Sequence, residues 1–178
     1  MPHTIGRYEL QDVIGEGATG TVYRAYDPAI GRAVAVKLIK FGTGTSQLTR
    51  DRVLCEARSG GTLAHPNVVT VFDVGGEGNL AFIAMELVDG PSLAARIVSS
   101  APFRPSSIVP WLDEIADALD HAHQRGVVHR DIKPSNILFG DAGPRRVVKL
   151  ADFGIAKALI DDEERAIPNR ATETNARG

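Results

Sequence analysis

The sequence predicts an α+β fold, in which an antiparallel sheet with one helix is followed by a mainly helical part. Runs rich in β-branched and aromatic residues, bounded by turn residues, predict a five-stranded sheet. These runs cover residues 7–16, 20–27, 33–39, 68–72 and 80–85. A helical stripe of apolar residues interrupts them at 46–63, and a longer one follows at 106–125. Ser106 or Ser107 is the expected N-cap of the longer helix.

The composition is that of an ordinary globular protein, with 43% apolar and 24% charged residues among 178. This length supplies one domain or two small lobes. The formal net charge of −2 argues against a general nucleic-acid binder. Cys55 is the single cysteine, which excludes an intrachain disulfide or a cysteine zinc site. No secretory leader and no apolar run of membrane-spanning length is visible, so we expect a cytoplasmic chain without a membrane segment.

A glycine-rich loop, Gly15-Glu16-Gly17-Ala18-Thr19-Gly20, lies between the first two expected strands. Glycines at this spacing let main-chain N–H groups approach phosphate oxygens. The same spacing also marks dinucleotide sites and plain turns, and a dinucleotide site needs a helix directly after the glycines. Here residues 21–26 are β-branched and aromatic, which favours a strand. The loop is therefore predicted to be a hairpin that covers phosphates.

Lys37 lies inside the apolar strand 33–39, where a lysine needs a partner or a route to water. One interpretation is an edge-strand lysine in solvent, and the other is a buried cation with a function. Glu56 in the helix 46–63 is either a solvated glutamate or the partner of Lys37. Gly60 and Gly61 weaken this helix by roughly 1 kcal/mol each, so we expect it to end early or to be mobile.

The polar cluster at residues 129–136, with the sequence HRDIKPSN, lies between two apolar runs. Asp131 can accept the proton of an incoming hydroxyl, and Lys133 can neutralise a transferring phosphate. Asn136 can offer its amide oxygen to Mg²⁺. A solvated loop is the alternative, but six specified residue types in eight positions rarely coincide by chance.

These pieces, in this order, resemble the protein kinase family. The resemblance rests on the glycine loop, on Val34-Ala35-Val36-Lys37, on the segment 85–90, on the cluster 129–136 and on Asp152-Phe153-Gly154 after the strand 147–150. It implies a protein-kinase-like fold that uses ATP and Mg²⁺. Lys133 implies, by the same resemblance, that the substrate is a protein with a Ser/Thr acceptor.

The resemblance also implies a role for each matching position. The catalytic residues would be Lys37, Glu56, Asp131 and Lys133, and the metal ligands would be Asn136 and Asp152. The nucleotide would be bound by Gly15, Glu16, Gly17, Ala18, Thr19, Gly20, Val22, Ala35, Lys37, Met85, Glu86, Val88 and Leu138. Among these, Met85 would be the gatekeeper, and Glu86 and Val88 would contact adenine through their main chains. Arg130 implies pairing with a phosphorylated threonine, for which Thr172 and Thr174 are candidates.

The expected organisation is a first lobe with the hinge at 1–88 and a partial second lobe at 89–160. Residues 161–178 would be part of an activation segment, polar and disordered. No A-P-E-like motif follows, so the resemblance describes a Ser/Thr kinase of the bacterial eukaryotic-like type, truncated within this segment. A nucleotide-binding or partner-binding module without transferase activity is the alternative. A third hypothesis is a fragment whose apolar face at 108–122 stays exposed and drives aggregation.

Overall fold

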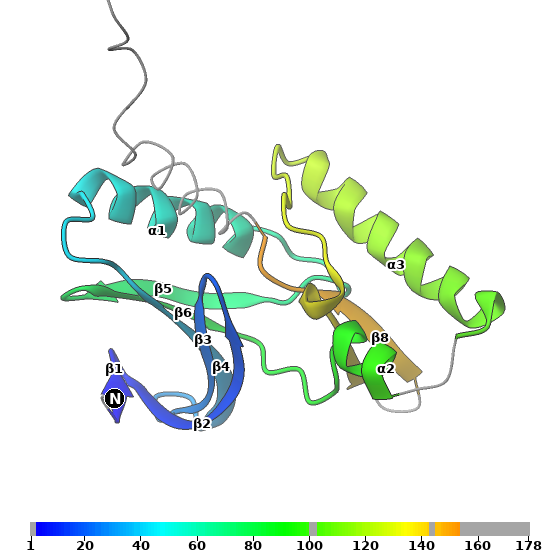
Figure 1. The fold of residues 1–178 in the computed structure, drawn as a ribbon, viewed down its shortest axis with the longest axis horizontal. Helices are drawn as coiled ribbons and strands as arrows, with labels where there is room; N and C mark the ends of the chain where they lie inside the picture. Colours follow the sequence, from blue (N-terminus) through cyan, green and yellow to red (C-terminus); the bar gives the residue numbers. More distant parts are fainter. Residues whose placement is uncertain (1–2, 100–102, 143–144, 154–178) are drawn as a thin grey trace, which may run out of the picture.

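The computed structural model describes residues 3–99, 103–142 and 145–153, which form two lobes joined by one extended segment (Figure 1). The first lobe contains β1 (Thr4–Ile5), β2 (Tyr8–Gly17), β3 (Gly20–Asp27), β4 (Arg32–Lys40), α1 (Gln47–Gly61), β5 (Val71–Glu77) and β6 (Leu80–Met85). The second contains α2 (Leu93–Ser99), α3 (Pro105–His123), a short 3₁₀ turn (Pro134–Asn136), β7 (Ile137–Ala142) and β8 (Arg145–Leu150). Residues 154–178, with Gly154, Thr172 and Thr174, lie outside the described part.

The sheet of the first lobe is antiparallel, with the order β1-β2-β3-β4-β6-β5. It has six strands rather than the five predicted, because the two-residue β1 is too short to give a pattern in the sequence. The strand predicted at 68–72 is also wrong in its bounds, since β5 begins at Val71. Val69 instead donates its N–H to the carbonyl of Leu150 in β8, at 3.0 Å. The preceding segment therefore belongs to the contact between the lobes.

The sheet is curled, and polar contacts join its two ends. The Arg7 guanidinium lies 3.2 Å from Asp27 and 3.0 Å from Asp73 of the opposite edge strand β5. Tyr8 also donates its hydroxyl to Asp73, at 3.1 Å. Asp27 is 1% exposed, so a paired charge is what permits its burial.

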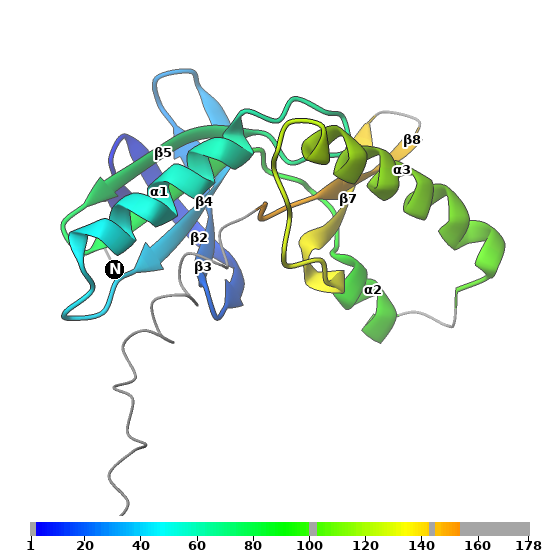
Figure 2. The same cartoon turned by 90° about the horizontal axis from the view of Figure 1, so that it is seen from above.

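Helix α1 lies across one face of this sheet, next to β5 (Figure 2). Ser46 caps its first turn, because its hydroxyl accepts the Thr49 N–H at 3.1 Å. The helix continues through Gly60 to Gly61, so the expected early end is wrong. A Cβ at Gly60 would lie 3.3 Å from the Phe153 carbonyl oxygen. The missing side chain thus lets α1 approach the segment that carries Asp152.

Helix α3 packs on the β7–β8 hairpin in the second lobe. Its inner face buries Ile115, Ala118 and Ala122 with residues of that hairpin. The helix begins at Pro105 with Arg104 as its N-cap and no side-chain cap, so the expected Ser106 or Ser107 cap is wrong. Proline suits the first helical position, where its missing N–H costs no bond. In the described residues no helix is both long and apolar enough to cross a bilayer.

Candidate active site

The glycine-rich loop is the turn between β2 and β3, as the sequence predicts, with Gly17 and Gly20 paired across it. Gly20 has φ +141°, and a Cβ there would lie 2.1 Å from the Leu38 carbonyl oxygen. Only glycine fits this position. A Cβ at Gly17 would meet nothing within 4 Å, so that residue is free of such a constraint. Ala18 and Thr19 form the turn itself, and Glu16 pairs with Thr21 beside it.

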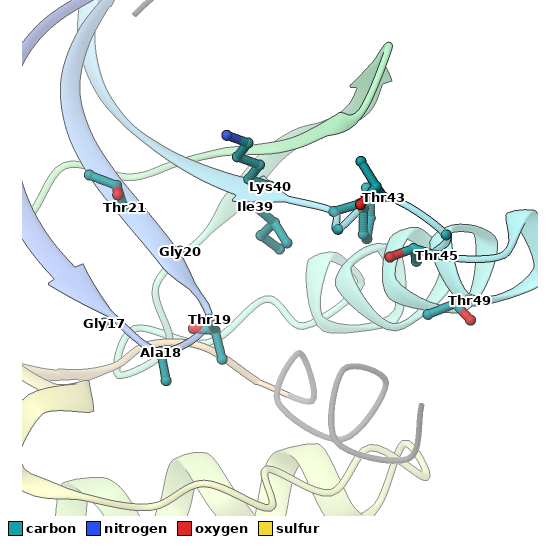
Figure 3. Close-up of a pocket in the computed structure, with 13 residues that line it drawn as sticks. Gly17, Ala18, Thr19, Gly20, Thr21, Ile39, Lys40, Thr43, Thr45 and Thr49 are labelled. Carbon is teal, nitrogen blue, oxygen red and sulfur yellow. The ribbon is translucent and has the colours of Figure 1, made fainter. Parts of the chain in front are cut away.

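A cavity of about 570 Å³ lies beside this loop, between residues 17–21 and residues 39–45 with Thr49 (Figure 3). Most of its labelled wall residues are glycines and threonines, and Ala18, Ile39 and Lys40 complete the labelled set. Lys37, Asp131 and Asp152 do not line it. The cavity is therefore separate from the charged groups described next.

Lys37 and Asp152 meet although they are 115 residues apart in the chain. The Lys37 Nζ lies 2.7 Å from the Asp152 Oδ2, and the lysine side chain is 3% exposed. A buried ammonium is tolerated where a carboxylate pairs with it. The edge-strand interpretation of Lys37 is therefore excluded. Asp152 itself is partly exposed, at 23%, and it has φ +65°, a left-handed conformation that is costly for a residue with a side chain.

Glu56 does not pair with Lys37 in this structure. Its Oε1 lies 3.7 Å from Arg130 Nη1, and its buried Oε2 has no hydrogen-bond partner among the described residues. The expected Lys37–Glu56 ion pair is thus replaced by two others, Lys37–Asp152 and Arg130–Glu56. The ammonium of Lys37 is occupied by the closer carboxylate, and Arg130 (φ +65°) projects toward α1.

The cluster at 129–136 is folded around Asp131. Lys133 Nζ donates to Asp131 Oδ2 at 2.7 Å, and Asn136 Nδ2 donates to the main-chain oxygen and to Oδ2 of Asp131, at 2.9 and 3.2 Å. Burial by itself would raise the pKa of Asp131, but the hydrogen bond and charge of Lys133, together with Asn136, outweigh it and lower the pKa. Asp131 is therefore an ionised acceptor at neutral pH.

His129 supports this loop from beneath, a role that the sequence alone did not reveal. It is 1% exposed, and its ring lies 4.5 Å from the ring of Phe153. The Asp131 N–H donates to Nδ1 at 3.2 Å, so Nδ1 is unprotonated and Nε2 donates to the Ala151 carbonyl at 2.9 Å. The Ala151 N–H in turn donates to the Asn136 carbonyl, at 2.9 Å. These hydrogen bonds thus connect the loop that carries Asp131 to the segment that carries Asp152.

The residues expected around adenine gather in one apolar cluster that joins the two lobes. Ala35 and Met85 are buried in it, and the partly buried Val22, Val88 and Leu138 pack against it. The N–H of Glu86 donates a hydrogen bond to the Thr70 carbonyl oxygen, at 2.8 Å. Glu86 therefore has its carbonyl oxygen, and not its N–H, to offer to an adenine.

The donor set fits Mg²⁺ bound together with phosphates. No group of three or more His, Cys, Asp or Glu side chains that could hold a metal occurs in the described residues. Mg²⁺ in nucleotide sites commonly takes one or two protein oxygens and completes its shell with phosphates and water. Asp152 supplies a carboxylate, and Asn136, which donates through Nδ2, keeps its Oδ1 for a cation.

Comparison with known proteins identifies a family and relatives of this chain. Residues 8–175 match the family described as protein kinase domain. The chain is 40% identical over 154 residues to serine/threonine-protein kinase PrkC of Bacillus subtilis. This matched region covers 86% of this chain and 23% of that protein. It is 37% identical over 169 residues to serine/threonine-protein kinase PknB of Mycobacterium leprae, covering 90% of this chain and 26% of the relative.

A solved structure shows the same fold. The kinase domain of Mycobacterium tuberculosis PknI superposes with a TM-score of 0.75 at 30% identity, over 85% of this chain and 61% of that domain. The chain thus spans about a quarter of the length of PrkC or PknB, and less than two thirds of a solved kinase domain. With a family match over residues 8–175 and with Lys37 and Asp152 in contact between the two lobes, the chain belongs to the protein kinase domain family.

Proposed function

We propose that this chain is a serine/threonine protein kinase that transfers the γ-phosphoryl group of Mg·ATP to protein hydroxyls. The observation that carries the proposal is the 2.7 Å contact between Lys37 and Asp152, which joins the predicted phosphate-binding and metal-binding groups across the two lobes. The relatives PrkC and PknB are named as serine/threonine kinases, which supports the Ser/Thr acceptor class.

In the proposed reaction, the acceptor oxygen forms a bond to the γ-phosphorus while the bond to the β,γ-bridging oxygen breaks, and ADP leaves. The carboxylate of Asp131 orients the acceptor hydroxyl and takes its proton. Lys133, 2.7 Å from that carboxylate, lies where it can offset charge on the transferring group. Mg²⁺, held by Asp152 and Asn136, would offset charge on the phosphates.

The second candidate function is nucleotide or partner binding without phosphoryl transfer. The observation that favours it is the pairing of Glu56 with Arg130, which leaves Lys37 without its expected partner. The family's transfer step needs the lysine–glutamate pair and the Asp–Mg²⁺ contact together.

The cytoplasmic location and the absence of a nucleic-acid partner remain predictions from the sequence.

A transfer assay separates the two candidates. Incubation of the chain with γ-labelled ATP, Mg²⁺ and a generic Ser/Thr protein acceptor should label the acceptor. Asp131→Asn should reduce the rate by about 10²-fold or more, since it removes the proton acceptor, while nucleotide binding persists. Binding without any labelling would favour the second candidate. Equal labelling by the parent and Asp131→Asn would contradict the role given to this carboxylate.

A further inference from the structure

Glu86, the first residue after β6, makes hydrogen bonds to Thr70 through both its main-chain N–H and its carboxylate. Its N–H donates to the Thr70 carbonyl at 2.8 Å, and its carboxylate accepts the Thr70 N–H at 3.2 Å. These two bonds close a ring between residues 70 and 86. Glu86 also begins the segment that would hold adenine through its main chain, so the direction of that segment depends on this ring.

Lys149 of β8 completes the support of Glu86. Its Nζ lies 2.9 Å from each of the Glu86 carboxylate oxygens. The side chains are only 17% and 29% exposed, and the residues are 63 positions apart. Dissolved salt screens a partly buried ion pair less than an exposed pair. Removal of one partner leaves the other charge partly desolvated and without a counter-charge.

The strand that carries Lys149 reaches both ends of the proposed nucleotide site. Lys149 pairs in register with Leu138 of β7, a member of the adenine-side cluster. The next residue, Leu150, exchanges main-chain hydrogen bonds with Asn67 and Val69, at 2.8 and 3.0 Å. Asp152, the partner of Lys37, follows two residues after Leu150. Strand β8 is therefore a common support for the adenine end and the phosphate end.

We propose that Lys149 is a positioning residue for the adenine ring, acting through the carboxylate of Glu86. It holds the segment 86–88 at a fixed distance from Leu138, so that the main-chain groups are aligned before the nucleotide arrives. This inference rests on the proposed nucleotide-dependent function. A merely structural ion pair would change stability, whereas a positioning pair changes affinity for the adenosine part of ATP and spares the triphosphate part.

Three probes, titrated into the 178-residue chain and its variants, test this assignment. They are Mg·ATP, adenosine, and Mg·tripolyphosphate, which lacks the adenosine. In Lys149→Met the affinity for ATP and adenosine should fall about fivefold or more, at the lower end of coupling between linked sites. Tripolyphosphate affinity should not change, because Lys37, Asp152 and the glycine loop are untouched.

Variants at the same site show whether Lys149 acts through Glu86. Lys149→Arg keeps the charge and should restore most of the affinity. In a Glu86→Gln background, Lys149→Met should cause no further loss, since the two residues act as one unit. Arg24→Gln, which removes an exposed pair with Asp89, is the matched control and should bind all three probes as the parent does.

Several results would overturn the assignment. Parental ATP affinity in Lys149→Met would do so, and so would an equal loss for all three probes. Should Lys149→Met fail to fold, Lys149→Gln takes its place, and an unfolded Lys149→Gln would reduce the pair to a folding requirement. A parent chain that binds none of the probes would refute the proposed function itself, and the role of Lys149 with it.

Discussion

The imidazole of His129 determines how the loop carrying Asp131 is held. Both ring nitrogens are engaged, one as an acceptor from the Asp131 N–H and the other as a donor to the Ala151 carbonyl. Burial lowers the pKa of His129, and the hydrogen bond to Ala151 and the charges of Asp131 and Asp152 only partly oppose this. Protonation of Nδ1 would remove an acceptor and place a charge in a buried site.

The pH dependence of stability follows from this lowered pKa. A histidine whose pKa is lowered by folding stabilises the native state above its unfolded value of about 6.5, and the contribution is lost as the pH falls through the folded value. The free energy of unfolding in urea should therefore decrease between pH 7.5 and pH 5. His129→Phe should show a shallower decrease over that range. An identical slope in both proteins would contradict the assigned protonation state.

Gly20 and Gly17 form a matched pair for testing the glycine loop. Gly20→Ala would place a Cβ 2.1 Å from the Leu38 carbonyl oxygen, so we expect a loss of about 1–3 kcal/mol of unfolding free energy. Gly17→Ala meets no atom within 4 Å and should change stability by less than about 0.5 kcal/mol. Urea unfolding of both variants measures the difference, and equal effects would contradict the described loop.

Which side chains lie together could be predicted from the sequence where they share one loop, and less well where a partner from another element decides. Asp131, Lys133 and Asn136 lie within one loop, and the structure brings them together. The prediction that Glu56 pairs with Lys37 was wrong, because the partner of Glu56 depends on how α1 lies against the loop that contains Arg130. That placement is set by tertiary packing, which no spacing in the sequence encodes.

Among the elements, α1 combines a weak helical sequence with close packing. Its final residues Gly60 and Gly61 face different neighbours, Phe153 at 3.3 Å and Val71 at 3.5 Å from an added Cβ. Propensity argued for an early end, but burial of Val53 and Ala57 keeps the helix intact to Gly61. Packing of α1 thus extends the helix beyond the end that its local propensity favours.

Alanine substitutions at these two glycines should separate propensity from packing. Gly61→Ala should stabilise the chain, by up to about 1 kcal/mol, since the added methyl makes an ordinary contact. Gly60→Ala should gain less or lose stability, because the methyl presses on the Phe153 main chain. The comparison uses urea unfolding of both variants. A larger gain at Gly60 would show that α1 is not packed closely there.

Strand and helix bounds were predicted where periodicity extends over many residues. The two-residue β1 carries no such pattern, and the segment before β5 reads as a strand but pairs with β8 of the other lobe. The start of α3 was also predicted inexactly. Ser106 or Ser107 was the expected N-cap, but the helix begins at Pro105 with Arg104 as its N-cap. Only in the segment before β5 was local propensity overridden by a partner distant in sequence.

On the scale of the whole molecule, the residues of the proposed site come from both lobes. The first supplies the glycine loop and Lys37, and the second supplies Asp131, Asn136 and Asp152. Their motifs predicted the family and the fold because each carries its own chemistry. Part of the apolar face expected at 108–122 is uncovered, since Val109 and Leu112 of α3 are 54% and 57% exposed.

Calorimetric titration of Mg·ATP into the parent chain, Lys37→Met and Asp152→Ala tests the central claim most directly. One saturable site should appear in the parent, and each substitution should weaken it by at least about tenfold, because each removes a charged group from the same phosphate and metal site. Circular dichroism of each variant confirms that it is folded. Unchanged affinity in both folded variants, or no saturable binding by the parent, would contradict the account.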